Sequence, residues 1–70
     1  MNGFKKVGEK IKYYREKRGL DKKVLAKYVG MSESRYEEIE AGRAIYQFWT
    51  LQKVANALEI DLPELLDFEL

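Results

Sequence analysis

The 70-residue sequence has no cysteine, no histidine and a single proline. The absence of cysteine excludes disulfides, and the absence of both metal-binding residue types excludes the usual structural zinc sites. A chain this short buries only roughly 60% of its extended surface on folding, so we expect modest stability. We predict one domain, residues 1–70, whose core is closed by packing alone or with the help of a partner chain.

Long apolar runs are missing as well. No run approaches the roughly 18 residues that span a bilayer, and we expect neither a signal peptide nor a membrane partner. A cytoplasmic protein agrees with the lack of cysteine. The sequence offers no histidine or cysteine nucleophile, no phosphate-cradling glycine loop and no pair of acids whose setting suggests catalysis. We therefore predict no enzymatic activity, no cofactor, no metal and no small-molecule substrate.

Charge is present in both signs but is unevenly distributed. Residues 1–20 carry seven Lys or Arg and two Glu, a sum of +5, whereas residues 21–40 sum to −1 and residues 41–70 to −3. A basic amino-terminal part can orient a protein on a polyanion, although it is equally explained as a solubilising face. Both interpretations apply to Lys5, Lys6, Lys10 and Lys12. The acidic tail, with Asp67 and Glu69, is expected either to fray or to pack on a second copy.

Apolar residues at helical spacing predict five helices and no strand, an all-α fold. The first helix spans about residues 4–18, with the apolar stripe Phe4, Val7, Ile11 and Tyr14. Two short helices, at about 22–29 and 33–41, end at Gly30 and Gly42. The fourth helix has the stripe Phe48, Leu51, Val54, Ala55 and Leu58, and a short fifth helix begins after Asp61.

Capping residues support these boundaries. Asp21 and Ser32 are predicted N-caps, and Asp61 with Glu64 has the spacing of a capping box. The turn at Gly30 joins two short helices in the manner of a helix-turn-helix unit.

Several segments resemble, in order, the helix-turn-helix domain of Cro and the phage repressors (lambda-repressor-like, or XRE). They are REKRGLDKKVLA at 15–26, Gly30-Met31-Ser32, the later residues Tyr36, Ile39, Glu40 and Gly42, LQKVANAL at 51–58 and LPELL at 62–66. The resemblance covers about residues 7–66. It implies a five-helix bundle, double-stranded DNA as the partner, and residues 32–41 as the recognition helix.

The resemblance also implies roles for individual residues. Arg15 should pair with Glu40 and fix the angle between two helices, because a guanidinium can hold a carboxylate with two hydrogen bonds. Base edges should be contacted by Glu33, Ser34, Arg35, Glu37 and Glu38. Phosphates should be contacted by Lys22, Lys23, Arg43, Tyr46 and Gln47.

The chain departs from the family pattern at two places. Glu33, Glu37 and Glu38 put acids on a face that meets phosphates, although a glutamate can accept a hydrogen bond from cytosine. Val24, Tyr28 and the segment 44–49 are unusually apolar, which is typical of interaction sites. For Phe48 and Trp49 we favour the interpretation that they complete the core. Of Tyr13 and Tyr14, we expect one to be buried and the other to be solvated.

Two functions remain open. The leading prediction is a sequence-specific transcriptional regulator, a small repressor that binds a two-part operator as a homodimer. The alternative is a protein-interaction module with the same fold, such as an antitoxin or regulatory subunit, which binds a protein partner and little DNA.

Overall fold

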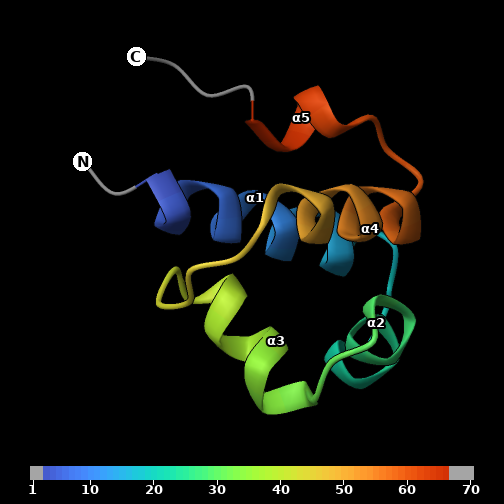
Figure 1. Cartoon of the computed structure of the whole chain (residues 1–70). Helices are drawn as coiled ribbons and strands as arrows, with labels where there is room; N and C mark the ends of the chain where they lie inside the picture. The colour runs from blue at the N-terminus through green and yellow to red at the C-terminus, as the bar shows by residue number, and fades with distance from the viewer. Residues whose placement is uncertain (1–2, 67–70) are drawn as a thin grey trace.

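The computed structural model describes residues 3–66, and this part of the chain folds into five helices without a strand. They are α1 (Gly3–Lys17), α2 (Lys22–Val29), α3 (Glu33–Glu40), α4 (Phe48–Leu58) and α5 (Leu62–Leu66). In Figure 1, α1 and α4 lie at the centre, α5 covers one side of this pair, and α2 and α3 lie on the other. The predicted all-α fold and helix order are confirmed.

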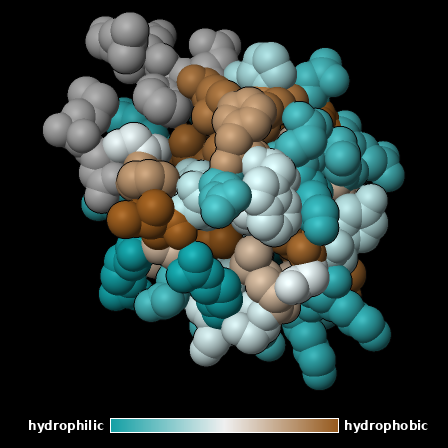
Figure 2. Space-filling view, viewed as in Figure 1, coloured by the Kyte–Doolittle hydropathy of each residue, from teal (hydrophilic) through white to brown (hydrophobic). Residues whose placement is uncertain are grey.

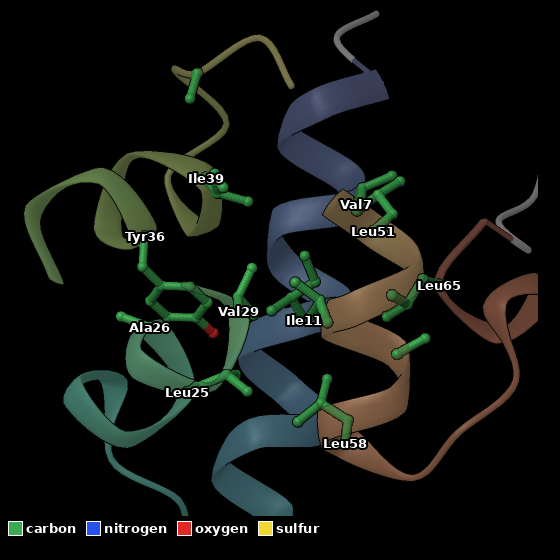
Figure 3. Close-up of a cluster of buried hydrophobic side chains, with 13 residues drawn as sticks. Val7, Ile11, Leu25, Ala26, Val29, Tyr36, Ile39, Leu51, Leu58 and Leu65 are labelled. Carbon is green, nitrogen blue, oxygen red and sulfur yellow. The ribbon is translucent and has the colours of Figure 1, made fainter. Parts of the chain in front are cut away.

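The core lies where α2 and α3 meet the central pair of helices, and it continues on the other side of this pair to Leu65 of α5 (Figure 3). Every helix contributes to it, because each has an apolar stripe at helical spacing. Tyr36 is the largest of the fully buried side chains. The other buried apolar residues are Val7, Ile11, Leu25, Ala26, Val29, Ile39, Ala44, Leu51, Val54, Ala55, Leu58 and Leu65.

Most predicted caps are present. The Ser32 hydroxyl accepts a hydrogen bond from the Arg35 N–H at 3.2 Å, and the Glu64 carboxylate accepts one from the Asp61 N–H at 3.0 Å. Asp21 occupies the N-cap position of α2, but its side chain makes no capping hydrogen bond. The predicted N-cap position is therefore confirmed, but without a capping hydrogen bond from the carboxylate.

The aromatic residues near α4 correct a second prediction. Phe48 and Trp49 are 65% and 54% exposed, so they do not complete the core. Phe48 is the first residue of α4, and a helical side chain leans over the preceding turn, which does not exist there. Tyr13 is exposed and Tyr14 is half-buried against the core, in line with the prediction. The acidic tail with Asp67 and Glu69 lies outside the described residues.

None of the described helices is long and apolar enough to cross a membrane.

Candidate nucleic-acid interface

A short turn fixes the geometry of α2 and α3. Gly30 ends α2 in the left-handed conformation, with φ of 91°, which glycine adopts without strain. Its N–H donates to the carbonyls of Ala26 and Lys27, so the last turn of α2 is closed. Ser32 is then the N-cap of α3. The two helices pack against each other and form the helix-turn-helix unit predicted from the sequence.

A buried ionic joint connects the end of α3 to α1. Arg15 Nε donates to Glu40 Oε2 at 2.6 Å, Arg15 Nη2 donates to Oε1 at 3.3 Å, and Arg15 Nη1 donates to the Leu20 carbonyl at 2.8 Å. The Tyr36 hydroxyl also donates to Glu40 Oε2. This arrangement satisfies both charged groups away from water, and it ties three segments together.

The joint shifts the titration of its members. The hydrogen bond to Glu40 is the main cause of a raised pKa of the Arg15 guanidinium. Burial is the main cause of a raised pKa of the Tyr36 phenol, and the Glu40 carboxylate adds to it, because an ionised phenol would lie beside a negative charge.

Close approach of the two backbones makes the joint possible. A Cβ at Gly8 in α1 would overlap the backbone carbonyl of Glu40, so only glycine fits at this position. The carboxyl end of α3 is therefore held against α1.

The opposite face of α3 is exposed to solvent. All five predicted base-contact residues lie on it: Glu33, Ser34, Arg35, Glu37 and Glu38. Two of them have partners in neighbouring segments. Glu37 Oε2 lies 3.8 Å from Lys22 Nζ of α2, and Arg35 Nη2 donates to the Ile45 carbonyl at 2.9 Å.

These contacts locate the predicted phosphate-contact residues. Lys22 and Lys23 begin α2 on one flank of α3, and the connection with Arg43, Tyr46 and Gln47 lies on the other. Lys23, Arg43 and Gln47 are exposed. Tyr46 is half-buried, its ring packs edge-on against Phe4, and burial raises the pKa of its phenol. Tyr46 and Lys22 are thus the two of the five that are not fully exposed.

Two exposed apolar surfaces accompany this interface. We call Ile45, Phe48 and Trp49 the loop patch; their side chains are 78%, 65% and 54% exposed. Val24 and Tyr28 form a second surface on α2, where they are also exposed. Figure 2 shows hydrophobic side chains in the upper and left parts of this view and hydrophilic ones along its right side. The apolar composition of 44–49 is the sequence signal for the loop patch, although the sequence alone favours a core role for Phe48 and Trp49.

Within residues 3–66, no three or more side chains of the types that ligate metals are gathered into one group.

Comparisons with known proteins agree with this geometry. A family model described as helix-turn-helix matches residues 11–65. No curated protein sequence matches the chain. The solved restriction-modification controller protein C.AhdI from Aeromonas hydrophila is 29% identical, with 89% of this chain and 94% of that chain covered and a TM-score of 0.84. The clp gene regulator ClgR from C. glutamicum is similar in fold, with 24% identity, 90% and 82% coverage and a TM-score of 0.85. The chain therefore belongs to the helix-turn-helix family of DNA-binding regulators, with the Cro and phage-repressor fold.

Proposed function

We propose that residues 1–70 act as one sequence-specific DNA-binding domain of a small transcriptional repressor, with α3 as the recognition helix. The observation that carries this proposal is the placement of cations on both flanks of an exposed α3. In this docking, α3 enters the major groove while Lys22, Lys23 and Arg43 meet phosphates on either side. The regulators C.AhdI and ClgR, which share the fold, support a role in transcription. Such a role places the protein in the cytoplasm, with the DNA.

Base reading is assigned to the exposed side chains of α3, above all Ser34 and Glu38. A glutamate accepts a hydrogen bond from the cytosine amino group, and a serine hydroxyl can bond to any base. The negative charge on the outer face of α3 is partly neutralised within the protein, because Lys22 lies beside the Glu37 carboxylate. This ion pair lowers the repulsion that Glu37 would otherwise meet from the phosphates.

A homodimer is part of the proposal. One short helix offers limited contact, and two copies on half-sites one helical turn apart double it. The loop patch supplies an apolar surface at the edge of the DNA-binding face, where a second copy would bury it.

A protein-interaction module is the second candidate. Three carboxylates on the outer face of α3, together with exposed Val24 and Tyr28, favour a protein partner over a polyanion. A stoichiometric partner that binds equally well after Lys22 and Lys23 are both replaced by Glu would support it.

Selection from a randomised duplex pool separates the two candidates. The purified chain is expected to enrich a two-part site, and its affinity for that site should fall steeply as salt rises. The matched control is the double variant Lys22→Glu/Lys23→Glu, which should enrich nothing. Absence of enrichment by the unaltered chain would contradict the repressor proposal.

A further inference from the structure

Among the described residues, backbone hydrogen bonds hold the connection between α3 and α4 only at its two ends. The Arg43 N–H donates to the Glu38 carbonyl at 2.9 Å, and the Gln47 carbonyl accepts from the Thr50 N–H at 3.0 Å. Between these two points the chain passes Ala44, which is buried, and Ile45, which is exposed. The position of this stretch therefore depends on side chains.

Arg35 supplies one of these side-chain contacts. It extends from α3 and donates from Nη2 to the Ile45 carbonyl at 2.9 Å. Its own backbone N–H is held by the Ser32 hydroxyl at the start of α3. A charged donor makes this a stronger bond than one between neutral groups. The recognition helix is thereby tied to the middle of the connection.

Trp49 supplies a second contact at the far end of the connection. Its Nε1 donates to the Gln47 side-chain oxygen at 2.7 Å, and the Lys53 ammonium lies 5.1 Å from the centre of its ring. Arg35, Ile45 and Trp49 line one open groove of about 480 Å³ between the start of α3 and the start of α4. Movement of the connection would therefore change the groove that the Trp49 ring lines and the position of its Gln47 partner.

We propose that Arg35 is a positioning residue for the phosphate-contact loop and does not read a base. This inference rests on the proposed function, since the loop carries Arg43 and Gln47 to the DNA. An arginine in a recognition helix can bond to guanine through its two-pronged guanidinium. Here the guanidinium is directed to a carbonyl of its own chain, and base reading falls to the remaining residues on the outer face of α3.

The test compares Arg35→Ala and Arg35→Lys with Lys23→Ala, which removes an exposed cation from the other flank. Each protein is measured for affinity to its selected duplex and to a scrambled duplex, and for base preference. Acrylamide quenching of Trp49, the single tryptophan of the chain, is followed in the free protein at one concentration. We expect Arg35→Ala to weaken both duplexes by the same factor, roughly three- to tenfold.

The free-protein readout distinguishes positioning from direct contact. Arg35→Ala should raise Trp49 quenching without changing base preference, and Arg35→Lys should restore part of both properties, because an ammonium can still donate to the carbonyl. Lys23→Ala should weaken both duplexes and leave quenching unchanged. A changed preference at one base, or a uniform loss of affinity with unchanged quenching, would overturn the proposal.

Failure of the proposed function is separately visible. If the unaltered chain selects no duplex, the proposed DNA-binding function is contradicted. Quenching of Trp49 in the free protein still tests whether Arg35 holds the loop. Unchanged quenching in Arg35→Ala would then overturn the positioning role itself.

Discussion

The two faces of α3 hold their charged groups in different ways. On the buried face, the Glu40 carboxylate meets Arg15 and Tyr36, and the Arg15 and Glu40 side chains are 9% and 5% exposed. On the outer face, Glu37 and Lys22 are 48% and 40% exposed and lie 3.8 Å apart. A buried charge depends on its partner, whereas an exposed pair is screened by water and contributes little to stability. Residues that hold α3 in the fold are therefore distinct from those on its outer face.

Removal of Arg15 should disrupt the ion pair on the buried face of α3 and have the largest effect on stability. Arg15→Ala leaves the Glu40 carboxylate without its cation, and we expect the free energy of unfolding to fall by about 3–5 kcal/mol. For a domain of this size that corresponds to a loss of well over 10 °C in melting temperature. Thermal unfolding followed by circular dichroism measures it.

Arg18→Ala is the matched control, because Arg18 pairs with Glu59 on the surface at 3.1 Å. We expect a change of less than about 1 kcal/mol for this variant. Equal melting temperatures for Arg15→Ala and the unaltered chain would contradict the structural role of the Arg15–Glu40 pair.

The helix boundaries were largely predictable from the sequence, whereas the contacts on the outer face of α3 were not. Gly30, Gly42 and the Ser32 cap located helix ends because they act through local backbone geometry. The end of α4 was less visible, since Glu59 adopts the left-handed conformation there without being glycine. Ion pairs and loop contacts on the outer face, such as Arg35 with Ile45, join residues ten positions apart and follow no helical period.

Substitutions on the outer face should affect binding rather than folding. Glu38→Ala is expected to change base preference at one position of the selected site, by about 1–3 kcal/mol of discrimination. Lys22→Ala should instead weaken binding to every sequence alike and reduce the slope of affinity against salt by about one phosphate contact. Duplex titrations at several salt concentrations compare the two. Equal, small effects of both changes would contradict the proposed docking.

Alkaline pH tests the contribution of Tyr36, which lies on the buried face of α3. The pKa of Tyr36 is raised in the folded chain above the ordinary value of 10.0. A group whose pKa is raised by folding contributes its full stabilisation at pH values below its pKa in the unfolded chain. The free energy of unfolding should therefore fall as pH rises above 10.0, by up to about 1.4 kcal/mol per pH unit. Tyr36→Phe should be less stable at neutral pH, because Glu40 loses a donor, yet show a shallower decline above pH 10.0.

Urea unfolding at a series of pH values measures this slope. Tyr13→Phe removes an exposed phenol and serves as the control. A slope unchanged by Tyr36→Phe would show that the joint does not govern alkaline unfolding.

The loop patch should show the smallest effect on stability and a clear effect on assembly. Phe48 and Trp49 are more than half exposed, so replacing both with Ser removes little buried area, and we expect the free energy of unfolding of the monomer to change by less than about 0.5 kcal/mol. If a second copy covers this surface, the double variant should stay monomeric at concentrations where the unaltered chain forms a dimer. Sedimentation velocity over a concentration series measures this difference.

The matched control is Val24→Ser/Tyr28→Ser, which removes exposed apolar side chains from α2 and should leave assembly unchanged. A large loss of monomer stability in the Phe48/Trp49 variant would mean that these exposed rings support the fold, as the buried residues do.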